Sequence, residues 1–228
     1  MKNFDITTTP WEFLKKFLKN PLSTTRDTEL DVKSASLLVA IFPVSMFLAL
    51  WALINNVLTT LANVLAIEIG SLFNGDYNVA ANIRADLVGD FNWMQLFANT
   101  LLTSLLWFAS ITFIPVFIAK LFKIEKKVCY KQLFTSSAII TLPMSILLFA
   151  AAFFGVVSLM IWLLIIAVLL IIPFLLHYAV IKQIFAVSSD VAFYIVLLTQ
   201  AIIILLVSLW SNLQATNLIE LFGQNLFW

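Results

Sequence analysis

Five long apolar runs divide the chain, and short polar stretches separate them. Each run is apolar on every side of a helix and lacks the apolar–polar alternation of a transmembrane β-barrel strand. A helix of about 20 apolar residues crosses a bilayer core of about 30 Å. The sequence therefore predicts an all-α polytopic membrane protein. Its five predicted transmembrane helices cover residues 35–58, 94–120, 134–155, 158–181 and 191–213.

Two features of these runs predict how the helices are connected. The first run continues to Ile67, about 48 Å as a single helix, so we expect it to protrude from the bilayer or to bend near Asn55 and Asn56. The third and fourth runs are separated only by Gly155 and the residues up to Ser158, which predicts a tight hairpin. The domain at 35–228 then carries one external loop, 69–93, which we expect to cap the bundle.

The segment 1–34 is polar and amphipathic. Thr9 and Pro10 have the order of an N-cap and a first helical residue, and Glu12 completes a capping box. The segment combines an apolar side with a lysine side, which is typical of a helix lying in the headgroup region. The predicted interfacial anchor residues are Trp11, Lys15, Lys16 and Lys19. The alternative is an ordinary polar segment that leads into the first span.

Composition supports the membrane assignment and excludes several other classes. The chain is 62% hydrophobic and 11% charged with a mean hydropathy of +1.04, so it lacks the polar residues that a soluble domain of 228 residues needs on its surface. A net charge of +1 argues against nucleic acid as a partner. Cys129 is the only cysteine, which excludes intrachain disulfides and cysteine-built metal sites.

The distribution of basic residues predicts the orientation. Of the 13 Lys and Arg residues, six precede the first run, five lie between Lys120 and Lys131, and Lys182 follows the fourth run. Only Arg84 falls on the other side, in a loop that is otherwise acidic. Because short cytoplasmic loops are enriched in Lys and Arg, an N-in/C-out topology is predicted.

Candidate chemistry is sparse, and we expect no catalytic, cofactor-binding or metal-binding residues. The single histidine, His177, is more readily interpreted as a hydrogen-bonded side chain near the cytoplasmic interface than as a catalytic base. Asp76, Asp86 and Asp90 fit a solvated acidic face better than a cation site. The predicted spans carry no acidic residue, which disfavours a proton-coupled pump.

Four of the five spans contain a proline, and the predicted topology places all four in the cytoplasmic half of the membrane. They are Pro43, Pro115, Pro143 and Pro173. Each proline leaves the carbonyl four residues earlier without its helical donor. The carbonyls are those of Val39, Ile111, Ile139 and Leu169. Hydroxyls near this level are expected to serve as partners, namely Ser45, Thr112, Ser137, Thr141 and Ser145.

One hypothesis is that the kinked helices splay apart and form a lipid- or partner-binding groove open to the cytoplasm. Its expected lining is Thr112, Thr141, Ser145, His177 and Tyr178. The alternative is that prolines are common in membrane helices and that their shared level is a coincidence.

The order of motifs resembles that of bacterial Yip1-type membrane proteins. The resemblance rests on an amphipathic segment ending in FLKNP, on the tight hairpin, and on a basic linker with Tyr130, Gln132, Ser136, Ser137, Leu142 and Pro143. A Gly-Tyr pair expected before Leu-Pro is replaced here by hydroxyl and aliphatic residues. The resemblance implies interaction with other membrane proteins, no catalytic residues and, for this chain, a bacterial plasma membrane.

The sequence therefore favours a non-enzymatic integral membrane protein that acts as a scaffold or accessory protein or organises the membrane. Its expected partners are the lipid bilayer and other membrane proteins. The alternative is a small transporter or transport-complex subunit that uses the predicted groove, and a membrane enzyme acting through His177 is the least favoured interpretation.

Overall fold

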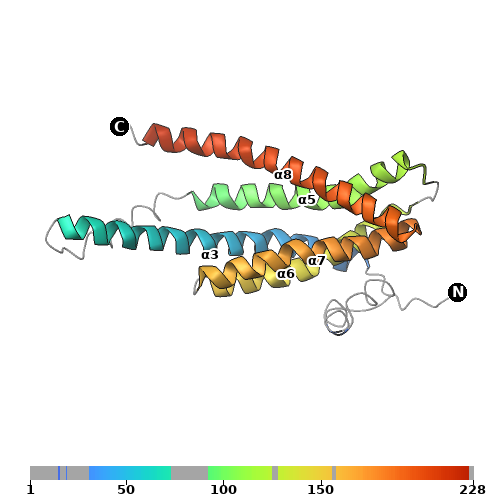
Figure 1. Ribbon diagram of the computed structural model, residues 1–228, viewed down its shortest axis with the longest axis horizontal. Helices are drawn as coiled ribbons and strands as arrows, with labels where there is room; N and C mark the ends of the chain where they lie inside the picture. The colour runs from blue at the N-terminus through green and yellow to red at the C-terminus, as the bar shows by residue number, and fades with distance from the viewer. Residues whose placement is uncertain are drawn as a thin grey trace.

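The computed structural model describes residues 31–72, 92–124, 128–155 and 158–225, together with Lys15 and Lys19. These ranges form five helices and no strand. The helices are α3 (Val32–Leu72), α5 (Trp93–Leu121), α6 (Tyr130–Gly155), α7 (Leu159–Phe185) and α8 (Ser189–Asn225) (Figure 1). Residues 69–72 of the predicted loop 69–93 belong to α3, and residues 92–93 form the start of α5. The rest of that predicted cap and the anchor residues Trp11 and Lys16 lie outside the described residues.

The prediction of an all-helical membrane protein is confirmed for the described ranges. Each of the five helices contains a stretch that is long and apolar enough to cross a bilayer. These stretches are Val32–Leu61, Trp93–Leu121, Tyr130–Gly155, Leu159–Phe185 and Ser189–Trp210. These stretches contain most of each predicted span. Their length and apolar composition are typical of an integral membrane protein.

The five helices lie roughly along one axis, and the two ends of the bundle differ. The turns from α5 to α6 and from α7 to α8 are at one end, together with the start of α3 (Figure 1). We call this the lysine-rich end, because it carries Lys33, Lys120, Lys123, Lys131 and Lys182. The α6–α7 hairpin lies towards the opposite end, which we call the far end.

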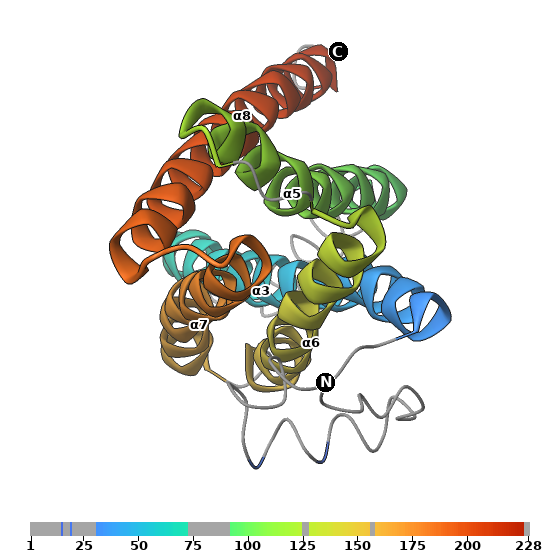
Figure 2. The same ribbon diagram turned by 90° about the vertical axis from the view of Figure 1, so that its right-hand side faces the viewer.

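Helix α3 occupies the middle of the bundle, as the end-on view shows (Figure 2). It packs most extensively against α6, which in turn packs against α7. On the other side α5 joins α3 to α8, whereas α3 and α8 barely touch. The arrangement is thus two groups, α3–α6–α7 and α5–α8, that meet where α3 packs against α5 and where α7 packs against α8.

Two hydrophobic cores reflect this grouping. The first core takes buried residues from all five helices, including Leu38, Ile111, Ile139, Ile181 and Ile195. The second core is built by α3, α6 and α7, and its half-buried rim receives only Trp107 from α5. Among the described side chains, α8 contributes none to the second core.

Helix α3 begins at a cap and runs without a break past the hairpin. The Asp31 carboxylate accepts a hydrogen bond of 3.0 Å from the Ser34 backbone N–H, as an N-cap residue does. A hydrogen bond from the Ser34 side chain and, second to it, this backbone bond lower the pKa of Asp31 below its usual value. At 41 residues α3 is about 61 Å long, and its C-terminal part extends beyond the α6–α7 hairpin (Figure 1). The helix is not interrupted at Asn55 and Asn56. Its protrusion from the bilayer stays a prediction.

Close contacts fix the far end of the hairpin against α3. The Asn56 side-chain N–H donates to the Gly155 carbonyl at 2.6 Å, and the Trp162 indole N–H donates to the Ala49 carbonyl at 3.3 Å. Gly155 lies under the Trp162 ring, where an added Cβ would meet the ring Cδ1 at 2.6 Å. Since Gly155 ends α6, its carbonyl has no helical donor, and Asn56 supplies one from another helix.

Candidate functional site

All four helix prolines are buried inside the bundle. Pro43, Pro115, Pro143 and Pro173 each lie on the inward side of their helix, and Pro115 is among the most deeply buried side chains. The prolines therefore take part in packing between helices rather than lining an exposed surface. The helices continue through each proline as α-helix.

The hydroxyl groups near the prolines bond mainly within their own helices. Thr112 donates to the Phe108 carbonyl at 2.8 Å, and Thr141 donates to the Ala138 carbonyl at 2.7 Å. Ser45 donates to the Phe42 carbonyl at 2.7 Å. None of these three acceptors is one of the four carbonyls that were expected to need partners, and only the Ala138 carbonyl is adjacent to one of them, that of Ile139.

Four of the five residues predicted to line a groove are buried. Thr112, Thr141, Ser145 and His177 lie in the interior, and Tyr178 is half-buried. The structure thus places them inside the packed bundle in the half nearer the lysine-rich end. A groove open to solvent at these residues stays a prediction.

The most polar contact in this interior joins α7 to α8. His177 is 1% exposed, and its Nδ1 lies 3.2 Å from the side-chain nitrogen of Gln200. The amide can donate this hydrogen bond, which leaves the proton of the neutral imidazole on Nε2. His177 Nε2 is itself buried with no partner in the described part of the chain, as is the Ser145 hydroxyl.

Charged residues are confined to the ends of the described bundle. The buried polar side chains of the described ranges are serines, threonines and His177, with no Asp, Glu, Lys or Arg among them. Lys120, Lys123, Lys131 and Lys182 are exposed, and the Lys182 amine donates to the Ser189 hydroxyl at 2.8 Å across the α7–α8 turn. Lys15 and Lys19 of the predicted anchor are also exposed and are helical.

The sequence did not indicate the contacts that three polar or aromatic residues make between helices. Gln200 pairs with His177, Asn56 caps α6, and Trp162 covers Gly155. An amide in an apolar run was a usable signal for Gln200 and Asn56, because an amide at membrane depth needs a partner. Nothing in the sequence indicated which helix would supply that partner.

The described residues offer no group of three or more histidine, cysteine or acidic side chains that could hold a metal ion. The site is therefore a buried, uncharged layer of hydroxyls, prolines and one imidazole. Comparison of the chain with protein-family models, with curated proteins and with solved structures found no match in any of the three.

Proposed function

We propose that the chain is a non-enzymatic integral membrane protein that serves as a scaffold or accessory protein for other membrane proteins, or organises the lipid around it. The observation that carries this proposal is the chemistry of the interior. Among the described residues its buried polar side chains are serines, threonines and His177, and Thr112 and Thr141 are already bonded to their own helices. An interior of this kind suits packing between helices better than it suits a catalysed reaction or a path for a solute.

The lysine-rich end supports a role at an anionic membrane surface. Lys120, Lys123, Lys131 and Lys182 are exposed at the same end of the bundle. Each basic residue near anionic headgroups contributes about 1 kcal/mol. We place this end in the cytoplasm, with the N-terminus inside and the C-terminus outside, in a bacterial plasma membrane.

The resemblance to Yip1-type proteins belongs to this proposal. In the described structure Tyr130 is the first residue of α6 and Pro143 is buried within it. Helix α6 is also the most deeply buried of the five spans. Ser137, Leu142 and Pro143, the buried residues among those that carry the resemblance, are therefore in a position to set how α6 packs, whereas Tyr130 is exposed. This is consistent with a structural rather than a catalytic role.

A second candidate is a small transporter or a subunit of a transport complex. Two buried polar atoms of the α6–α7 hairpin, His177 Nε2 and Ser145 Oγ, have no partner in the described ranges. Polar groups in this position line solute paths in transporters. The absence of a buried acid or base among the described residues disfavours ion coupling by the chain alone.

Two measurements on the purified full chain separate these functions. In lipid nanodiscs, recovery of a membrane protein at a fixed stoichiometric ratio supports the scaffold or accessory role. Solute flux into liposomes that contain only this protein would overturn it. A third experiment uses the His177→Ala variant. If this variant folds and binds its partner but loses the protein's function, that loss would indicate chemistry at the imidazole.

A further inference from the structure

The last turns of α5 lie at the outside of the bundle. Helix α5 continues through the buried Pro115 and ends at Leu121, with Phe122 as its C-cap. Its ribbon bends outward over these turns, and its end lies at the periphery beside α8 in both ribbon views (Figure 1, Figure 2). Helix bends of this kind commonly occur at proline, which removes one helical hydrogen bond. The inner side of these turns still packs, because Ile118 and Ala119 are buried.

The outer side of the same turns is apolar and uncovered. Phe113, Phe117 and Leu121 are 58%, 62% and 67% exposed. Residues four apart share one side of a helix, so these three side chains form a row along the outside of α5, which we call the α5 stripe. The stripe lies within the candidate membrane span Trp93–Leu121, where acyl chains surround it.

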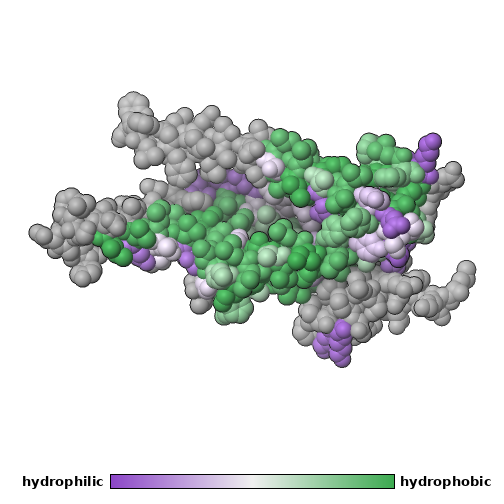
Figure 3. Space-filling view, viewed as in Figure 1, coloured by the Kyte–Doolittle hydropathy of each residue, from purple (hydrophilic) through white to green (hydrophobic). Residues whose placement is uncertain are grey.

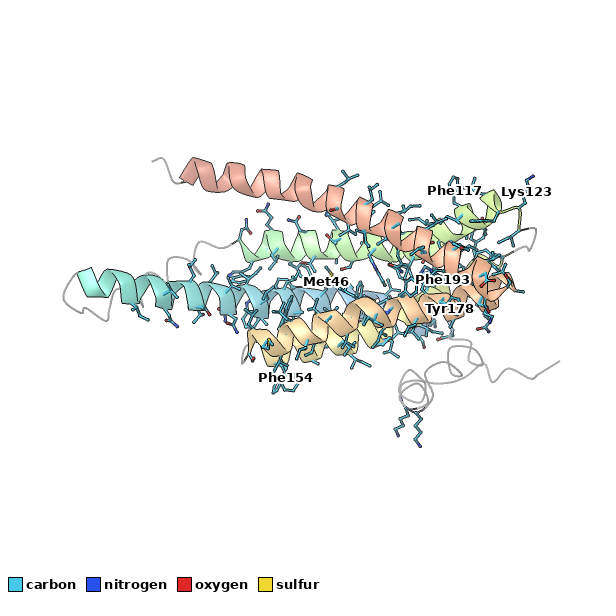
Figure 4. The ribbon with its side chains drawn as sticks, in the orientation of Figure 1. Met46, Phe117, Lys123, Phe154, Tyr178 and Phe193 are labelled. Carbon is cyan, nitrogen blue, oxygen red and sulfur yellow. The ribbon has the colours of Figure 1, made fainter. Side chains whose placement is uncertain are left out.

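Two lysines lie where the α5 stripe ends. Lys120 and Lys123 are both exposed. Phe117 and Lys123 lie on the same outer corner of the bundle (Figure 4). In the space-filling view the hydrophobic surface of this corner reaches a hydrophilic edge at the lysine-rich end (Figure 3). Helix α5 contains no Asp or Glu, so no acid of its own helix neutralises the two amines.

Backbone hydrogen bonds fix the position of the second lysine. The Ile124 N–H donates to the Ala119 carbonyl at 3.0 Å. The Lys123 N–H donates to the Lys120 carbonyl, also at 3.0 Å. With Lys123 at a φ of 55°, the two bonds form a Schellman motif, in which glycine is the usual residue at this position. The motif holds the backbone of Lys123 against the last turn of α5, so the amines of Lys120 and Lys123 can reach one anion.

We propose that the end of α5 binds one anionic phospholipid, with its phosphate between Lys120 and Lys123 and an acyl chain along the α5 stripe. An ammonium group donates charge-assisted hydrogen bonds to phosphate oxygens, and basic residues at the membrane surface attract anionic headgroups. Charge complementarity therefore favours lipid over an apolar helix of another protein, which would bring no anion to the two amines. This inference deepens the proposed role at an anionic membrane surface and rests on it.

Native mass spectrometry of the full chain in detergent tests the proposal. The protein is titrated with dioleoylphosphatidylglycerol and, separately, with dioleoylphosphatidylcholine, which have the same acyl chains and different headgroups. We expect the first phosphatidylglycerol to bind at least about tenfold more tightly than the first phosphatidylcholine. Excess inorganic phosphate should not displace the bound lipid, because it has no acyl chain to contact the α5 stripe.

Three double variants locate the charged part of the site. Lys120→Gln with Lys123→Gln removes both charges and should weaken phosphatidylglycerol binding by at least about fivefold. Lys120→Arg with Lys123→Arg keeps both charges and should bind within about twofold of the unaltered protein. Lys131→Gln with Lys182→Gln is the matched control, because it removes two exposed charges elsewhere on the lysine-rich end and should also stay within about twofold.

A further pair of variants tests the apolar part of the site. Phe117→Ala shortens the α5 stripe and should weaken phosphatidylglycerol binding by about twofold to fivefold. Phe153→Ala is its control, since Phe153 is 74% exposed at the far end, and it should leave the affinity unchanged. Each variant is first checked for a native helical spectrum and a single elution peak in detergent.

Equal affinities for the two lipids overturn the proposal. An equal loss in the Lys120/Lys123 and Lys131/Lys182 glutamine variants also overturns it, because the attraction would then be spread over the whole lysine-rich end. The scaffold function is tested separately, by partner recovery in nanodiscs of phosphatidylcholine alone. Partner recovery there, together with equal lipid affinities, would refute the lipid site and leave the scaffold function standing.

Discussion

Two side chains, Asn56 and Trp162, join α3 to α6 and to α7 at the far end. Asn56 extends from α3 to the last carbonyl of α6, and Trp162 of α7 returns to the backbone of α3 at Ala49. One bond runs from α3 to α6 and the other from α7 to α3. The Trp162 ring can approach Gly155 closely because Gly155 has no side chain. The sequence marks Asn56 as an amide in an apolar run and Gly155 as part of a tight hairpin, but it does not indicate that the two residues meet.

Replacing Asn56 by Leu should destabilise the protein by about 0.5–2 kcal/mol, since the Gly155 carbonyl would lose its donor inside the membrane protein. Asn55→Leu is the matched control, because it changes the neighbouring half-buried amide and should stay within about 0.5 kcal/mol. Reversible unfolding in mixed detergent micelles measures both values. Equal effects of the two substitutions would contradict the capping role.

Adding a methyl group at position 155 should lower the stability of the protein by more than the small size of the group implies. Gly155→Ala places a Cβ about where the Trp162 ring lies, and overpacking of this kind costs about 1–3 kcal/mol. In a double-mutant cycle with Trp162→Leu, the cost of Gly155→Ala should shrink, because the ring is no longer there. Strictly additive unfolding free energies would show that the two residues do not compete for space.

The Asp31 cap should respond to acid. Its pKa is lowered by the Ser34 hydrogen bonds, so its stabilisation of α3 is present above the ordinary carboxyl value of 3.8 and is lost as the pH falls through the lower folded value. Hydrogen exchange at the start of α3 should therefore accelerate in this acidic range. In Asp31→Asn, which keeps a capping oxygen without the charge, this acceleration should be absent.

The helices themselves show which properties a sequence reveals and which it hides. Length and apolarity predicted five spans, because each is a local property of one run. The buried face of each helix was not predictable, since a membrane helix is apolar on every side and its lipid-facing and buried residues have similar hydrophobicity. Thus α7, the most apolar span, is the least buried, while the hydroxyl-rich α6 is the most buried.

The prolines illustrate the same limit. Their shared occurrence in four helices was visible in the sequence, and a splayed groove was the hypothesis drawn from it. In the structure Pro43, Pro115, Pro143 and Pro173 all face the interior. Whether a kink opens or tightens a bundle depends on which way the proline points, and that is decided by neighbouring helices.

The α7–α8 pair should behave as a coupled polar contact. His177→Leu and Gln200→Leu should each destabilise the protein by about 0.5–2 kcal/mol, since each leaves a polar partner inside the membrane. The double variant should cost less than the sum by roughly 0.6–1.7 kcal/mol, the range of such bonds in membrane proteins. Unfolding in mixed micelles measures the cycle, and zero coupling would contradict the contact.

The whole molecule combines one core that involves all five helices with a second core that excludes α8. The sequence predicted the number of helices and their hairpin, but it did not predict this division, because contacts between α3 and α6 or between α5 and α8 join residues far apart in the chain. The orientation in the membrane stays a prediction that rests on the basic residues.

That orientation can be measured with the native cysteine. Cys129 is exposed at the lysine-rich end, so a membrane-impermeant thiol reagent should label it only in inside-out vesicles. In a Cys129→Ser background, Met160→Cys, which is exposed at the far end, should label only in right-side-out vesicles. The reverse result at both positions would invert the proposed topology.

Because α8 shares only the first of the two cores, its attachment is one-sided. The helix has 37 residues, about 55 Å, and among its side chains described up to Trp210 the last fully buried one is Ile203. Lateral pressure in the far leaflet would therefore act on a long arm that pivots near the His177–Gln200 contact. A change in bilayer thickness or tension would move this helix before it disturbed the α3–α6–α7 group, which makes α8 the mechanically compliant part of the protein.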